Sequence, residues 1–133
     1  MAALGVHHVG IAVDDLDAAV AAYRVLFGAT LEHRERVGDQ GVEAASLRVG
    51  GSRIELLRPL GPDTAVGRFL AKRGPGMHHV AFESDDVAGE LERLRAEGVR
   101  LIDEEPRRGL FGLQVAFVHP EATGGVLAEF VGR

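Results

Sequence analysis

The stretch that decides the fold of this chain reads HHVGIAVDD and occupies residues 7–15. It returns as HHVAFESDD over residues 78–86, with both histidines and both aspartates at the same offset. A repeat of this length and spacing indicates an internal duplication. We therefore expect two similar structural modules, each of which delivers one histidine to a shared site.

The composition limits the kind of protein that this chain can be. Its 133 residues, 46% hydrophobic and 26% charged, fit one compact soluble domain. A net charge of −5 argues against nucleic acid as a main partner, although a few local arginines can still hold a small anionic ligand. The chain has no cysteine, so any metal must be held by histidine and carboxylate groups.

The sequence also bears on location. No apolar run is long enough to cross a membrane, and no basic and apolar leader precedes the first expected strand. The lack of cysteine is compatible with a reducing compartment. We expect a cytoplasmic protein with no membrane partner.

The hydrophobic pattern predicts the first module. Alternation over residues 6–13 predicts a strand with His8, Gly10 and Ala12 on one face. Asp14 or Asp15 is expected to cap the following helix, which Gly28 ends. The apolar residues that recur at helical spacing in it are Leu16, Val20, Tyr23, Leu26 and Phe27. Three strands are expected over residues 30–37, 42–49 and 53–57, with a hairpin turn at Gly50-Gly51.

A linking helix and a second module follow. Residues 64–73 predict a helix capped by Asp63 and stopped by Gly74. The second module then repeats the order of the first. Its expected elements are a strand over 77–83, a helix from Asp85 or Asp86 to Gly98, and strands over 99–103, 113–119 and 125–131, with a loop over 106–112. The expected fold class is α+β, in the form of two tandem βαβββ modules over about residues 4–60 and 77–133, joined by a linker over about 61–76.

Each module also has one acidic residue in its otherwise apolar last strand, Glu55 in the first and Glu129 in the second. A buried carboxylate without a partner is costly, and a divalent cation shared with His8 and His79 would remove that cost. Mixed nitrogen and oxygen ligands suit Zn, Co, Ni, Fe or Mn better than Ca or Mg. The alternative for each residue taken alone is an ordinary solvent-facing strand position. The other four histidines are expected to have structural, surface or turn roles: His7, His33, His78 and His119.

With this arrangement of residues, the chain resembles the vicinal oxygen chelate superfamily and, within it, the family of methylmalonyl-CoA epimerases. The segments that carry the resemblance are HHVGIAV, IELLRPLGPDT, FLAKRGPGMHHVAF, GVRLIDEEPRRG and VAFVHPEATGGVLAEF. The resemblance covers essentially the whole chain. It implies a homodimer in which His8, Glu55, His79 and Glu129 hold one divalent metal, typically cobalt. It also implies interconversion of (2R)- and (2S)-methylmalonyl-CoA by proton abstraction at C2 through a metal-chelated enolate.

Epimerisation needs a base on one face of C2 and an acid on the other. The resemblance implies two glutamates in these roles, of which one is the ligand Glu129 and the other lies in a segment of the form G-V-x-E. Here the segment reads Gly41-Val42-Glu43-Ala44, so that the acidic residue comes one place early. A shift by one residue turns a side chain to the other face of a strand. Either a bulge restores Glu43 to the site, or another group, such as water, carries the second proton.

The coenzyme A phosphates need cationic contacts. The candidates, which lie in loops or at a helix end, are Lys72, Arg73, Arg107 and Arg108, and ordinary surface charge is the alternative for each. The loop over residues 109–112, GLFG, is more apolar than in many members of the family. A larger 2-substituted malonyl-CoA therefore stays open as the substrate.

Three other functions compete with this hypothesis. A glyoxalase-type lactoylglutathione lyase would use the same four ligands with nickel or zinc, but the DEEPRRG and HPEATGGVLAE segments favour the epimerase. A ring-cleaving dioxygenase needs a site of two histidines and one carboxylate with open positions, and four candidate ligands leave fewer of these. A non-catalytic protein of the same fold that binds small ligands without a metal is disfavoured because all four candidate ligands are present.

Overall fold

A computed structural model describes residues 2–133 of the chain, and it divides into two compact units. One unit covers His8–His78. The other covers His79–Arg133 together with the residues up to His7. The boundaries cut β1 (Gly5–Ala12) and β5 (Gly76–Glu83) between the two histidines of each pair. The units thus follow the two expected modules except in these two strands, each of which begins in one unit and ends in the other.

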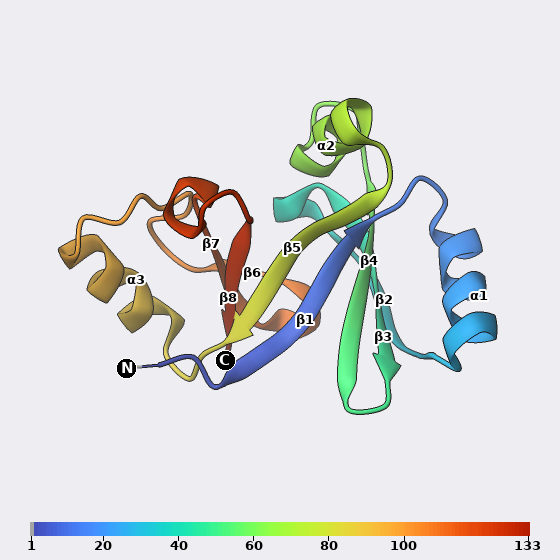
Figure 1. Ribbon diagram of the computed structural model, residues 1–133, viewed down its shortest axis with the longest axis horizontal. Coiled ribbons are helices and arrows are strands. Elements are labelled where there is room, and N and C mark those ends of the chain that lie inside the picture. The colour runs from blue at the N-terminus through green and yellow to red at the C-terminus, as the bar shows by residue number, and fades with distance from the viewer. Residues whose placement is uncertain (1) are drawn as a thin grey trace. The chain divides into compact units, whose positions relative to one another are not determined.

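The unit over residues 8–78 contains the first βαβββ module. Within it β1 pairs in parallel with β4 (Ser52–Pro59), and β4 pairs antiparallel with β3 (Val42–Val49). Strand β3 in turn pairs antiparallel with β2 (Thr30–Val37). A short 3₁₀ turn (Gly38–Gln40) connects β2 to β3. The strand order within this unit is therefore β2-β3-β4-β1 (Figure 1).

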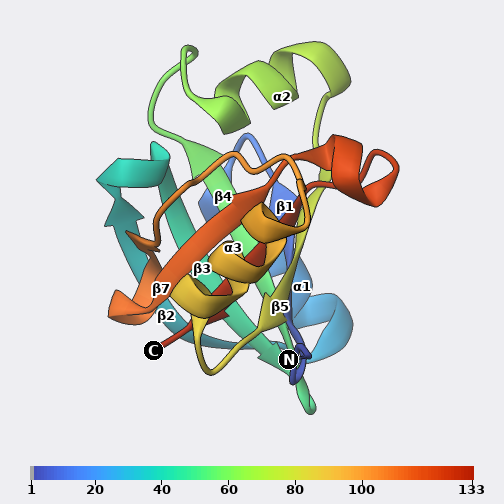
Figure 2. The same ribbon diagram turned by 90° about the vertical axis from the view of Figure 1, so that its left-hand side faces the viewer.

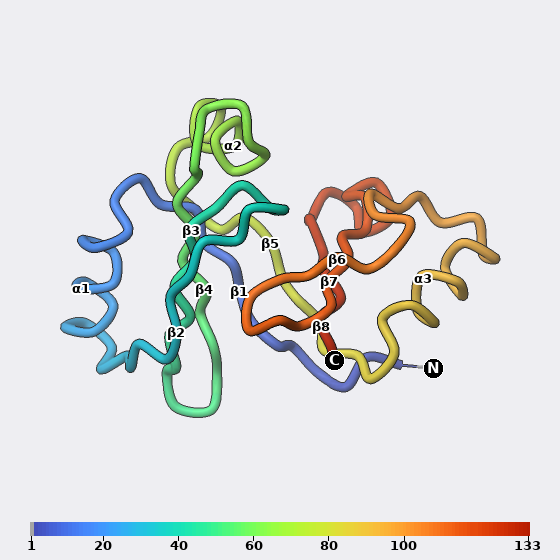
Figure 3. Tube along the Cα trace, turned by 180° about the vertical axis from the view of Figure 1, so that it is seen from behind, coloured from blue at the N-terminus to red at the C-terminus, as the bar shows by residue number. Residues whose placement is uncertain are grey.

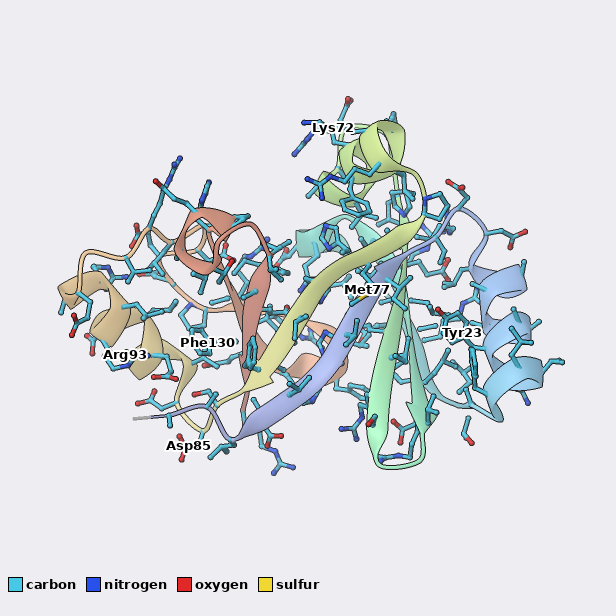
Figure 4. The ribbon with its side chains drawn as sticks, viewed as in Figure 1. Tyr23, Lys72, Met77, Asp85, Arg93 and Phe130 are labelled. Atoms are coloured by element: carbon cyan, nitrogen blue, oxygen red, sulfur yellow. The ribbon has the colours of Figure 1, made fainter. Side chains whose placement is uncertain are left out.

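Helix α1 (Leu16–Phe27) covers one face of these strands (Figure 1). Asp15 is its N-cap and accepts a hydrogen bond from the amide of Ala18 at 3.0 Å. Asp15 was one of the two residues predicted to cap this helix. The cluster under the helix is formed by Leu16, Val20, Ala29, Ala45, Leu47 and Leu56, with Tyr23 packed against it (Figure 4). The apolar spacing was misleading at the C-terminal end of the helix, because Leu26 and Phe27 are exposed.

Helix α2 (Ala65–Arg73) follows β4. Its N-cap is Thr64 and not Asp63, so the sequence-based prediction was wrong by one residue. The Thr64 hydroxyl accepts a hydrogen bond from the amide of Gly67 at 3.0 Å and donates one to the carbonyl of Gly61 at 2.8 Å. It therefore satisfies both the helix end and the preceding turn.

The unit that contains residues 79–133 holds the second module. Strand β5 pairs in parallel with β8 (Ala128–Gly132), and β8 pairs antiparallel with β7 (Gln114–Val118). Helix α3 (Val87–Ala96) lies against β7 and β8 (Figure 2). Its N-cap is Asp86, which accepts from the amide of Gly89 at 2.9 Å. The residues that pack beneath it are Val87, Leu91, Leu101, Ala116 and Phe130.

The last strands of the second module differ from the prediction. Residues 99–103 form no strand, and only an isolated bridge joins Leu101 to Val118. The fourth strand is instead β6 (Arg107–Arg108), which lies beside β7 inside the predicted loop (Figure 3). A 3₁₀ turn (Leu110–Gly112) completes that loop. Strand β8 begins later than predicted because a 3₁₀ turn (Pro120–Thr123) and two positive-φ glycines, Gly124 and Gly125, precede it.

In each unit the strands thus have one face under a helix and one face turned away from it. Side chains at positions two apart share a face. In the first module Ala45 and Leu56 lie under α1, so Glu55 and its neighbours lie on the other face. In the second module Ala116 and Phe130 lie under α3, so Glu129 lies on the other face. No helix among residues 2–133 has the length and apolar character needed to span a membrane.

Candidate functional site

The first module brings one histidine and one glutamate together. Gly10 of β1 pairs with Glu55 of β4, and His8 lies two residues before Gly10 on the same face. The Nε2 atom of His8 lies 3.4 Å from the Oε2 atom of Glu55. Both residues are buried, with exposed fractions of 4% and 8%. The two residues that the strand pattern selected in the first module are therefore in contact.

The second module repeats this arrangement with its own residues. Ala81 of β5 pairs with Glu129 of β8, which puts His79 and Glu129 on one face. The Nε2 atom of His79 lies 3.2 Å from the Oε1 atom of Glu129. Each residue is 3% exposed. Two copies of one motif thus produce two buried histidine–carboxylate pairs of nearly equal separation.

The surroundings of the second pair are aromatic. Phe117 of β7 pairs in register with Glu129, and its ring meets the His79 ring edge to face at 5.5 Å between centroids. The Arg107 guanidinium lies over the Phe117 ring, 6.0 Å from its centroid, and its Nε atom is 3.1 Å from Asp103. A carboxylate oxygen of Asp103 also accepts from the amide of Phe117 at 2.8 Å. Phe117 was not predicted from the sequence, and only its position in an apolar strand could have pointed to it.

The residues around the first pair, His8 and Glu55, have small side chains. Ser46 of β3 pairs in register with Glu55, and its exposed fraction is 2%. Ala44 and Ala12 lie on the same face and are buried as well. Ser46 was also missed at the sequence level. The signal was available, since a hydroxyl at an inward position of an apolar strand needs a polar partner.

Glu43 does not lie with these residues. The β3–β4 register runs without a break from Val42 to Val49, so no bulge restores Glu43 to the face of Glu55. It faces the other way, where one carboxylate oxygen lies 2.9 Å from Arg58 and the other lies 3.1 Å from Arg34. These two guanidinium groups, Arg58 first, hold the pKa of the Glu43 carboxyl below its ordinary value. The alternative in which a bulge brings Glu43 to the site is therefore wrong.

The remaining predicted residues occupy ordinary positions. His33 lies 2.9 Å from Glu35, and the Nδ1 atom of His119 accepts from the amide of Glu121 at 3.0 Å. His78 packs edge to face on Phe69, and His7 is half-buried. Three of the four cationic candidates are exposed: Lys72, Arg73 and Arg108. Arg107 is half-buried.

The donor types fit a first-row divalent cation. His8, His79 and Glu129 are buried, and each offers one ligand atom to a metal ion. Glu55 is a second buried carboxylate beside His8, but it is not a member of this group. Imidazole nitrogen and carboxylate oxygen suit such cations, which act as Lewis acids or activate a bound water. The residues that a metal centre needs are therefore present in both modules.

Comparisons with known proteins agree with this description. The sequence pattern of the Glyoxalase/Bleomycin resistance protein/Dioxygenase superfamily matches residues 7–117. An ethylmalonyl-CoA/methylmalonyl-CoA epimerase of Cereibacter sphaeroides is 38% identical over 125 residues, which cover 92% of this chain and 93% of the relative. The crystal structure of the methylmalonyl-CoA epimerase from Mycobacterium tuberculosis is 42% identical, with a TM-score of 0.94 over 98% of this chain and 88% of that one. A methylmalonyl-CoA epimerase in complex with methylmalonyl-CoA and NH₄⁺ is also 42% identical, with a TM-score of 0.95 over 98% of this chain and 95% of that one.

Proposed function

Because the chain belongs to the Glyoxalase/Bleomycin resistance protein/Dioxygenase superfamily, we propose that it interconverts (2R)- and (2S)-methylmalonyl-CoA. The observation that carries this proposal is the duplicated, buried histidine–glutamate pair, His8 with Glu55 and His79 with Glu129. Relatives at about 40% identity over nearly the whole chain are named as epimerases of this substrate.

The proposed cofactor is one divalent metal ion held by all four of these residues. Their burial supports it, because two carboxylates and two imidazoles inside the protein are stabilised by a shared cation. Co²⁺ is the proposed ion, and Zn, Ni, Mn and Fe fit the same donors. When bound, the ion supplies Lewis acidity that stabilises negative charge on the thioester oxygen of the substrate.

The chain's own residues then move the proton. In this mechanism the Glu129 carboxylate accepts the proton from C2, and the electron pair of the broken C–H bond passes into the enolate. Inversion requires a proton to return to the opposite face of C2. Ala44 has no group that can supply it, and Glu43 points toward Arg58 and Arg34. A water molecule is therefore the proposed second proton carrier, and Glu129 returns its proton to solvent to complete the balance.

The coenzyme A part of the substrate needs cationic contacts. Lys72, Arg73 and Arg108 are exposed and remain the proposed partners of its phosphates. Arg107, which is next to Arg108 in sequence and half-buried, is the fourth candidate. A homodimer and a cytoplasmic location complete the proposal. The homodimer rests on the likeness to the epimerase family.

The test follows hydrogen exchange at C2. Metal-loaded protein is incubated with (2S)-methylmalonyl-CoA in D₂O, and deuterium and configuration are read by NMR and mass spectrometry. We expect exchange with inversion that a chelator abolishes and that Glu129→Gln reduces at least 100-fold. Bound metal without C2 exchange would overturn the epimerase proposal, and glutathione hemithioacetals would then be the next substrates to assay.

A further inference from the structure

The two modules differ at one matched position. In each module the glutamate of the last strand has one in-register neighbour on the adjacent antiparallel strand. That neighbour is Phe117 for Glu129 and Ser46 for Glu55. In the second module an aromatic ring therefore lies beside the carboxylate and packs on His79. In the first module a hydroxyl occupies the equivalent place.

The strand pairing brings Ser46 and Glu55 close together. Val42 of β3 pairs with Pro59, which has no amide hydrogen, and the amide of Leu60 donates to the carbonyl of Gly41 at 2.8 Å. Hydrogen-bonded and non-hydrogen-bonded pairs alternate along an antiparallel ladder. The pair of Ser46 with Glu55 is therefore of the non-hydrogen-bonded type, in which the Cα atoms are about 4.5 Å apart and the side chains are closest. The Ser46 and Glu55 side chains are thus direct cross-strand neighbours on one face.

The setting favours a contact between the two. Ser46 is 2% exposed and Glu55 is 8% exposed, so neither side chain has ready access to bulk water. On this face Ser46 has the apolar pair Ala44 and Leu57 on one side and the pair Arg48 and Arg53 on the other. Both guanidinium groups donate to the Glu32 carboxylate. A buried hydroxyl without a partner is costly, and a carboxylate is the strongest acceptor that this face offers.

We propose that Ser46 is a positioning residue whose hydroxyl turns to donate a hydrogen bond to the Glu55 carboxylate when an ion is bound, and so fixes Glu55 as a metal ligand. The proposal rests on the proposed function in one respect, namely that Glu55 helps to hold the ion. A carboxylate ligand is held in place by hydrogen bonds to its other oxygen, and loss of such a partner typically costs 10–100-fold in metal affinity. The Phe117 position provides no such donor to Glu129, so the two carboxylates are not equivalent.

The experiment compares two variants of the same shape, Ser46→Thr and Ser46→Val, which differ by a hydroxyl in place of a methyl group. Co²⁺ affinity is measured by calorimetry on the full chain after removal of metal, with Ser46→Ala as a smaller variant and Ser52→Ala as a control at the exposed start of β4. We expect Ser46→Thr to bind Co²⁺ at least tenfold more tightly than Ser46→Val, and Ser46→Ala to resemble Ser46→Val. Ser52→Ala should bind like the parent.

Equal Co²⁺ affinity of the Thr, Val and Ala variants would overturn the proposal. Glu55→Gln shows which part has failed. If Glu55→Gln binds weakly while all three Ser46 variants bind like the parent, the metal site stands and the role of Ser46 is refuted. The affinity measurement needs no substrate, so it is independent of whether the chain exchanges the C2 hydrogen of methylmalonyl-CoA.

Discussion

Glu43 and Arg58 form an ion pair of 2.9 Å across β3 and β4, on the face that packs toward α1. A second contact of 3.1 Å joins Glu43 to Arg34 of β2. The one acidic residue of the Gly41-Val42-Glu43-Ala44 segment thus has a structural role on the face opposite Glu55. The proton chemistry must therefore be carried by other groups.

Glu43→Gln is expected to leave the rate of C2 exchange unchanged and to destabilise the protein by about 0.5–1 kcal/mol, the range of partly exposed ion pairs. The folded-state pKa of Glu43 lies below its ordinary value of 4.5. Its stabilising contribution is therefore complete above about pH 4.5 and disappears as the pH falls through the folded-state pKa. Urea unfolding of parent and variant at neutral and acid pH measures this difference.

Glu92→Gln serves as a control, because Glu92 is an exposed residue of α3. It should change neither the exchange rate nor the stability at any pH. A loss of C2 exchange in Glu43→Gln, with the fold intact, would show that Glu43 takes part in the proton transfer.

Ala44→Glu is expected to raise the rate of inversion. Ala44 lies on the same face of β3 and β4 as Glu55, which is the face of the proposed metal site. General acid–base catalysis typically contributes 10²–10⁴-fold, so we expect inversion to rise about 100-fold relative to the parent. The matched variant Ala44→Gln has the same size without a titratable group and should show no increase. Equal inversion rates in the two variants would contradict the prediction, because they would show that a carboxylate at this position does not speed inversion.

The repeat predicted most of the fold and the four candidate metal ligands, because a strand with a histidine and a strand with a glutamate occur in both modules. His8 and Glu55 were each selected from the pattern of their own strand, and their side chains lie 3.4 Å apart. The errors have local causes. Residues 99–103 join β7 only through an isolated bridge at Leu101, and Arg107–Arg108 pair with Val115 and Gln114 further along β7. Thr64 rather than Asp63 caps α2 because its hydroxyl also bonds to Gly61. Phe117 and Ser46 were missed because their importance depends on which residue pairs with them across strands, and one sequence does not give that register.

Removal of metal should lower stability as well as activity. A ligand that binds only the folded state stabilises it by about 2.7 kcal/mol at 100 times its dissociation constant. We therefore expect a chelator to lower the thermal unfolding temperature and abolish C2 exchange, and added Co²⁺ to restore both. Glu129→Gln should respond much less to either treatment because it lacks one buried ligand. An unfolding temperature that is indifferent to Co²⁺ in the parent would contradict the metal site.

Gly67→Ala is expected to destabilise the protein although it lies inside α2. A methyl group at this position would meet the carbonyl oxygen of Gly61, and it would lie 2.9 Å from the carbonyl oxygen of Pro62. Both are backbone atoms, so the turn that begins the helix must shift. Overpacking of this kind costs about 1–3 kcal/mol and outweighs the gain of about 1 kcal/mol in helix propensity. Gly38→Ala is the control, since nothing lies within 4 Å of its added methyl group. Urea unfolding should show a loss only for Gly67→Ala, whereas a more stable Gly67→Ala would mean that the 61–64 turn does not pack against this helix as described.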